Sequence, residues 1–171
     1  THHDLRRLSQ GLKRPAASLV AWLPPDEIDM TNERGSFVRL AVGRRLMVLA
    51  HSGDACQMLQ PDQRCSAYAH RPLDCRLYPF HVERGKRGQP LELTRLDPNG
   101  CGVKGDPADF KQLDTLDVQR WLELGEYQER LLRWNKQASH RLRLGKPLLD
   151  ETAFLEFLRL GGSAAPDAVS P

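Results

Sequence analysis

Leucines recur at helical spacing near the start of the chain. Leu5, Leu8 and Leu12 fall on one face of the segment, and Pro15 follows as a stop signal. A charged or polar residue occupies most of the positions between them. This pattern predicts a short amphipathic helix over residues 4–12.

The part of the chain after residue 107 has the same helical period over a longer stretch. Apolar residues return there at intervals of three to five positions, with charged residues between them: Val118, Leu122, Tyr127, Leu131 and Trp134. We expect a helix, interrupted at Gly125, with Trp121 and Trp134 in the core. Asp150 can cap a last helix that runs to Leu160, and three apolar residues of that helix would face inward: Phe154, Leu155 and Leu158.

Between these helical parts the sequence favours strands and turns. Residues 37–50 are rich in strand formers on both sides of Gly43-Arg44, which predicts a hairpin. Residues 76–83 and 91–96 predict two further strands, joined by the turn-rich residues 84–88. We therefore predict an α+β fold. It would have a loop-rich domain over residues 1–110, a helical extension over residues 111–160 that packs on it, and a disordered tail over residues 161–171.

Composition and charge indicate a globular protein and argue against nucleic-acid-binding and membrane-spanning classes. Hydrophobic residues make up 40% and charged residues 27% of the 171 positions, as in globular proteins. The net charge of +3 is too small to indicate nucleic-acid binding. No apolar run reaches the roughly 20 residues that cross a bilayer, and the first residues lack the apolar core of a signal peptide. We expect a cytoplasmic protein with a possible protein partner or protein substrate, and the sequence does not indicate its oligomeric state.

The cysteines are the residues that point to a specific chemistry. The chain has four of them in the spacing Cys-x8-Cys-x9-Cys-x25-Cys: Cys56, Cys65, Cys75 and Cys101. The paired Cys-x2-Cys of zinc ribbons and bacterial ferredoxins does not occur. Four thiolates still complete a tetrahedral zinc site or a [4Fe–4S] cluster. Disulfides and free structural thiols remain alternatives, although a chain without an export signal favours metal binding over disulfides.

Histidines and aromatic residues are weaker candidates for the same site. His51, His70, His81 and His140 are possible ligands, but each fits a surface or hydrogen-bonding role better. Tyr68 and Tyr78 are expected to pack over the site. His2 and His3 are compatible with the remnant of a tag.

The residues around the second and third cysteines resemble a known family. Within residues 65–80, eight positions match the pattern of the YkgJ-type cysteine-cluster family, whose members are described as zinc- or iron-chelating: Cys65, Tyr68, Arg71, Pro72, Cys75, Arg76, Tyr78 and Pro79. Cys56-Gln57-Met58-Leu59 and Cys101-Gly102 resemble two further elements of the family. The resemblance covers about residues 4–105. Asp4-Leu5-Arg6-Arg7-Leu8 is similar to the family's Asp-x-x-Arg-Leu helix, so the cysteine-dense motif that usually precedes this helix would fall just before Thr1.

The resemblance implies a metal-binding protein with Cys56, Cys65, Cys75 and Cys101 as ligands. Long, irregular spacings favour a [4Fe–4S] cluster over zinc, which is the alternative metal. A flagellin lysine methylase resembles the family in its cysteine cluster, so a cluster-dependent enzyme that modifies protein, similar to a lysine N-methylase, is the alternative function. Four residues between and beside the ligands are expected to support the site without binding metal: Arg71, Pro72, Asp74 and Arg76.

Overall fold

The computed structural model describes residues 1–28, 36–53, 55–85, 90–95 and 110–161. Helices and short antiparallel strands alternate along them, which confirms the α+β fold. The helices are α1 (His2–Leu12), α2 (Leu73–Leu77), α3 (Phe110–Arg143) and α4 (Glu151–Phe157). The strands are β1 (Val20–Leu23), β2 (Val38–Leu40), β3 (Gly43–Leu49), β4 (His51–Ser52), β5 (Ala55–Cys56), β6 (Phe80–Arg84) and β7 (Pro90–Arg95). Among the described helices, none is long and apolar enough to cross a membrane.

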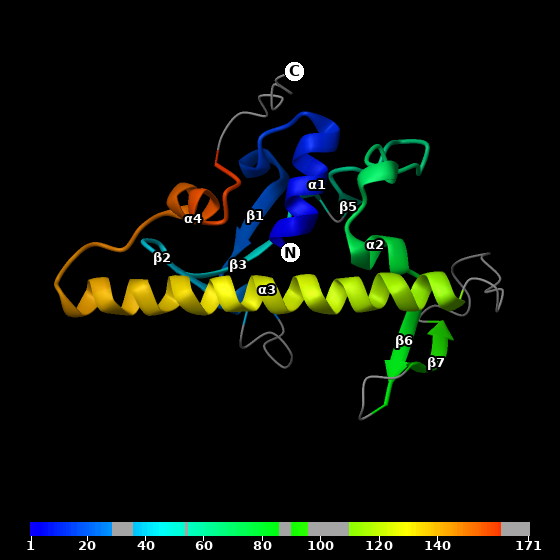
Figure 1. Cartoon of the computed structure of the whole chain (residues 1–171). Coiled ribbons are helices and arrows are strands. Elements are labelled where there is room, and N and C mark those ends of the chain that lie inside the picture. Colours follow the sequence, from blue (N-terminus) through cyan, green and yellow to red (C-terminus); the bar gives the residue numbers. More distant parts are fainter. Residues whose placement is uncertain (29–35, 54, 86–89, 96–109, 162–171) are drawn as a thin grey trace, which may run out of the picture.

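Helix α3 is the longest element, and the other elements are arranged along it (Figure 1). Helices α1 and α4 and strand β1 lie on one side of it in this view, and the hairpin β6–β7 projects from the opposite side near its N-terminal end. The small sheet has the order β1-β3-β2, with both pairs antiparallel. Its β2–β3 hairpin pairs Leu40 with Gly43, which has a positive φ of 103° that favours glycine.

The core lies between α1, the sheet, α4 and the C-terminal half of α3. Leu8, Leu19 and Phe154 are fully buried in it. The Trp134 ring on α3 meets the Phe154 ring edge-on at 5.1 Å, and its Nε1 donates to the backbone oxygen of Arg39 at 2.9 Å. An indole that is both packed and hydrogen-bonded fixes the position of α3 on β2 and α4.

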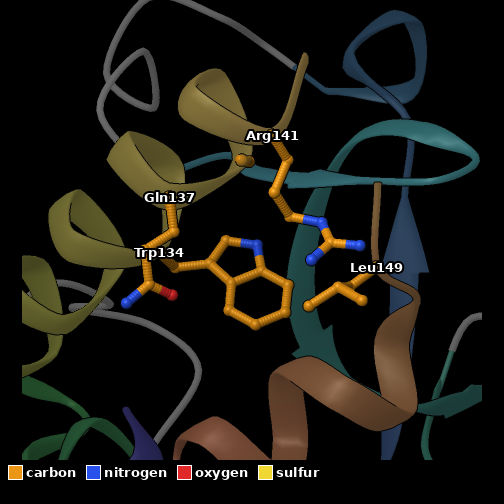
Figure 2. A pocket seen from close by; sticks show the side chains of 5 residues that line it. Trp134, Gln137, Arg141 and Leu149 are labelled. Carbon is orange, nitrogen blue, oxygen red and sulfur yellow. The ribbon is translucent and has the colours of Figure 1, made fainter. Parts of the chain in front are cut away.

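The segment between α3 and α4 lies beside the same tryptophan. Figure 2 shows the Trp134 ring beside Leu149, with Gln137 and Arg141 on the next turns of α3. The backbone oxygen of Leu149 accepts from the amide of Ala41 at 2.8 Å. This contact brings the start of α4 to the edge of the sheet.

Most of the expected elements are present. Helix α1, the hairpin within residues 37–50 and the α4 cap are confirmed, and Asp150 accepts from the amide of Ala153 at 2.9 Å. Phe154, Leu155 and Leu158 face inward as predicted, with exposures of 0%, 4% and 0%. The tail at residues 162–171 and the turn at residues 86–88 lie outside the described residues, and so does the last position of the predicted strand 91–96.

Three expectations about the elements are wrong. Helix α3 continues through Gly125, because this residue faces open space and a long helix absorbs the loss of roughly 1 kcal/mol that one glycine causes. Residues 76 and 77 belong to helix α2, so the strand begins later, at Phe80. Trp121 is 51% exposed instead of buried, because the face of α3 that carries it points to solvent.

Candidate metal centre

Three of the predicted ligands lie on three separate short elements. Cys56 ends β5, where it pairs with His51, and Cys65 forms an isolated bridge with Leu59. Cys75 is the middle residue of α2. Cys101 lies outside the described residues, so the structure does not test whether it joins the other three.

The loop from Cys56 to Cys65 is fixed by backbone hydrogen bonds and by one buried side chain. The amide of Leu59 donates to the Cys56 oxygen at 2.9 Å, and the amide of Ser66 donates to the Met58 oxygen at 2.8 Å. Met58 itself is 3% exposed. Cys56 and Cys65 both pack against the hydrophobic core. The loop therefore holds two thiols at the edge of the core instead of in open solvent.

The three described cysteines are free thiols. Partial burial of the Cys75 thiol raises its pKa, and the neighbouring Cys56, Asp74 and Cys65 raise it further, while Arg71 lowers it. A thiol surrounded by other acidic groups is stabilised as a thiolate when a metal cation binds.

Helix α2, which carries Cys75, is anchored from α1. The buried carboxylate of Asp4 accepts a hydrogen bond from the amide of Leu73 at 2.9 Å, across 69 residues of sequence. Pro72, at the start of the helix, has no side-chain group that could cap it. Leu73 and Leu77 are 1% and 5% exposed and hold the other face of α2 in the interior. Asp4 thus orients the turn that presents Cys75.

A network of charges connects this anchor to α3. Arg7 donates to Asp4 and, through its two terminal nitrogens, to both carboxylate oxygens of Glu123 at 2.7 and 2.8 Å. Burial alone would raise the pKa of Glu123, but the hydrogen bonds from Arg7 and Gln119 outweigh it and leave the pKa below its usual value. Burial also opposes ionisation of Asp4, whose pKa is nevertheless lowered by hydrogen bonds from the amide of Leu73 and the hydroxyl of Thr1. Both carboxylates are therefore ionised at neutral pH.

The residues expected to support the site have different contacts. Arg71 donates from Nε to the backbone oxygen of Tyr68 at 3.1 Å, within the loop between Cys65 and Cys75. Asp74 is within 3.5 Å of Arg120 on α3. Arg76 is exposed and lines a surface pocket of about 360 Å³ together with Arg7, His70 and Arg71. Positive charge therefore gathers beside the cysteine-bearing loop.

The two tyrosines do not pack over the site. Tyr68 is 67% exposed and Tyr78 is 54% exposed, because the segments before and after α2 turn these side chains outward. The Tyr68 ring instead lies under the guanidinium of Arg71, whose Cζ is 3.7 Å from the ring centroid. This cation–π contact stiffens the Cys65–Cys75 loop from its solvent side.

Sequence reasoning missed the histidines that form a cluster. Within the described residues, three or more metal-binding atoms lie within 4.8 Å of one another only at His2, His3 and Glu126. The three described sulfurs are therefore spread more widely than 4.8 Å. Both histidines belong to the first turn of α1, and His2 is fully buried there. The Thr1-x-x-Asp4 capping box was the signal in the sequence that an ordered helix starts here.

The chemistry of the cysteine region fits a metal that prefers sulfur. Three free thiols come from a short strand, a loop and a helix, and each is at least partly accessible. Such soft donors suit iron–sulfur clusters and zinc. Bound there, the metal or cluster would supply a structural crosslink or, for iron–sulfur, a one-electron redox centre.

Comparison with known proteins agrees with this chemistry. No curated protein and no solved structure has significant similarity to the chain. A family model described as "CxxCxxCC: Putative zinc- or iron-chelating domain" matches residues 20–102, which include all four cysteines. Residues 20–102 therefore belong to this family, the YkgJ-type cysteine-cluster family.

Proposed function

We propose that the chain holds a [4Fe–4S] cluster through Cys56, Cys65, Cys75 and Cys101. The observation that carries the proposal is the presence of three free, partly accessible thiols between β5 and α2, inside the segment that matches a zinc- or iron-chelating family. Cys101 completes the set of four thiolates that a cubane cluster requires.

The spacing of the sulfurs favours the cluster over zinc. A tetrahedral zinc site with Zn–S bonds of about 2.3 Å places its sulfurs roughly 3.8 Å apart. The sulfurs of Cys56, Cys65 and Cys75 do not all lie within 4.8 Å of one another. A cluster of eight inorganic atoms spans a wider gap than one ion, and Arg71 and Arg76 lie beside the loop to offset its negative charge.

Elemental analysis of anaerobically purified protein tests this proposal. We expect about four iron and four sulfide per chain for one such cluster, a brown colour, and loss of both elements in Cys75→Ser. Stoichiometric zinc without sulfide would overturn the cluster and keep the cysteine centre. Protein whose metal content is unchanged when the cysteines are replaced would overturn the centre itself.

Arg76→Ala sharpens the test. Arg76 lies next to Cys75 but is exposed, so its loss should weaken metal retention without abolishing it. The rate at which a chelator removes metal measures this effect. The matched control is Arg64→Ala, because Arg64 neighbours Cys65 but its side chain is 85% exposed and is within 3.8 Å of Asp62. Equal rates for the parent and Arg76→Ala would contradict the supporting role.

The setting proposed for this activity is the cytoplasm, where thiols stay reduced and available to metal. A protein partner or protein substrate would approach the exposed side of the Cys65–Cys75 loop. Methyl transfer from labelled S-adenosylmethionine to protein lysines would support an enzymatic role of the lysine N-methylase type, and its absence in metal-loaded protein would leave metal binding as the function.

A further inference from the structure

A second group of metal-binding side chains lies where α1 meets α3. His2 and His3 are the first two residues of α1, and Glu126 lies near the middle of α3. Nε2 of His3 is 2.7 Å from Oε2 of Glu126, and the two imidazole centroids are 4.0 Å apart. One ligand atom from each of the three residues lies within 4.8 Å of the other two. Helix packing thus brings together donors that are more than 120 residues apart in sequence.

His2 supplies an independent observation that a ligand belongs here. Its side chain is 0% exposed, and neither ring nitrogen has a hydrogen-bond partner in the described part of the protein. The hydroxyl of Tyr127, whose ring stacks on His2 with centroids 6.0 Å apart, is buried and likewise has no described partner. Polar atoms buried without partners are costly, and in native proteins they usually have a functional explanation.

We propose that His2, His3 and Glu126 bind a divalent transition-metal ion, with zinc as the ion that suits this donor set best. Two imidazoles and one carboxylate are the ligands of many zinc sites that keep an open position for water. The side chains of His3 and Glu126 are 26% and 60% exposed, so an ion can enter from solvent while His2 binds it from the interior.

Glu126 is the one carboxylate of the group, and it supplies the negative charge that the two neutral imidazole ligands lack. The site is chemically distinct from the cysteines, because its nitrogen and oxygen donors are harder than sulfur.

Metal binding by the intact chain tests the proposal. Zinc is added as the chloride, and zinc bound per chain is measured by equilibrium dialysis and elemental analysis in the parent, His3→Ala, Glu126→Gln and the double variant. His2 is left unchanged because its replacement could unfold α1. The control is Glu129→Gln, one turn along α3, where Glu129 is exposed and pairs with Arg133 at 3.3 Å. We expect the double variant to bind about one zinc ion fewer than the parent, and the control to bind the same amount as the parent.

The difference between parent and variants removes the contribution of the cysteines, so the result holds whether or not they carry a cluster. Nitrogen NMR of the imidazoles gives a second readout. Zinc should shift a ring nitrogen of His2 in the parent and in Glu129→Gln, but not in the double variant. Equal zinc binding by parent and double variant, or His2 signals that zinc leaves unchanged in the parent, would overturn the proposal.

Discussion

The two halves of α3 attach to the rest of the protein by different means. The C-terminal half attaches through apolar contacts. Leu131 and Trp134 are 1% and 4% exposed against the core, and Trp134 contacts the rings of Phe154 and Phe157. The N-terminal half attaches through ion pairs of two buried carboxylates, Asp117 and Glu123, which are 1% and 8% exposed. One continuous helix therefore joins an apolar core to a polar attachment surface.

The charged half organises the elements around the cysteines. Asp117 accepts from Arg84 on β6 at 2.7 Å and from Arg120 at 2.9 Å, and Arg84 also reaches Asp114 at 2.8 Å. Glu123 binds Arg7 of α1, which in turn holds Asp4 against α2. Directional contacts of this kind fix orientation more tightly than apolar packing does. The apolar half thus supplies most of the stability, and the charged half positions the cysteine-bearing segments.

Phe154→Ala should have the largest effect on stability, because it removes the fully buried ring of α4 that packs against the apolar half of α3. We expect a loss of about 3–5 kcal/mol in the free energy of unfolding, measured by denaturant titration. Trp121→Ala is the control, since Trp121 is an aromatic residue of α3 that is 51% exposed and should change stability by less than about 0.5 kcal/mol. Similar losses in both variants would contradict the division of α3 into two kinds of surface.

Glu123→Gln should destabilise the protein by about 2–3 kcal/mol, because Arg7 would lose a buried charged partner. The effect depends on pH in a defined direction. The pKa of Glu123 is lowered in the folded protein, so its contribution is complete above the unfolded pKa of about 4.3 and is lost as the pH falls through the folded value. Unfolding free energies of parent and variant should therefore converge in acid.

Glu129→Gln is the matched control for this prediction, since its pair with Arg133 is solvent-exposed and contributes at most about 1 kcal/mol. A difference between parent and Glu123→Gln that persists unchanged to low pH would show that the carboxylate charge is not what stabilises this contact.

Replacing either of two helix glycines with alanine should change stability by a smaller amount, in opposite directions for the two positions. A Cβ at Gly11 of α1 would lie 2.1 Å from the His70 ring, so Gly11→Ala should destabilise by about 1–3 kcal/mol. Gly125 of α3 has nothing within 4 Å of the position that a Cβ would take, so Gly125→Ala should stabilise by about 0.5–1 kcal/mol. Thermal unfolding midpoints measure both, and a lower midpoint for Gly125→Ala would contradict the open surface assigned to this face.

Local patterns in the sequence predicted the elements that depend on local interactions. The leucine spacing of α1, the hairpin around Gly43 and the Asp150 cap each arise from residues close in sequence, and the structure contains all three. Strand β1 was not predicted, because its pairing of Val20 with Leu49 spans 29 residues. Residues 76 and 77, at the end of α2, were assigned to a strand for the same reason, since Asp4, which anchors α2, is 69 residues away from Leu73 in sequence.

The candidate metal centre was predictable only as a set of residue types. The match at positions such as Cys65 and Cys75 identified the family, and the family model agrees with it. Distances between the sulfurs and the outward positions of Tyr68 and Tyr78 depend on tertiary contacts that one sequence does not display. The burial of His2 is a consequence of docking on α3, so the capping box at Thr1 and Asp4 marks His2 as part of a helix but not as a buried residue.

The hydrogen bond from Leu73 to Asp4 bears on the order in which the protein assembles during synthesis. A helix of five residues, such as α2, is too short to persist alone in water. Its cap, Asp4, is part of α1, which leaves the ribosome about 60 residues earlier. Because the chain emerges with its N-terminal part first, α2 can dock on Asp4 while Cys101 is still inside the ribosome. At that stage three thiols are already accessible to whatever delivers the metal.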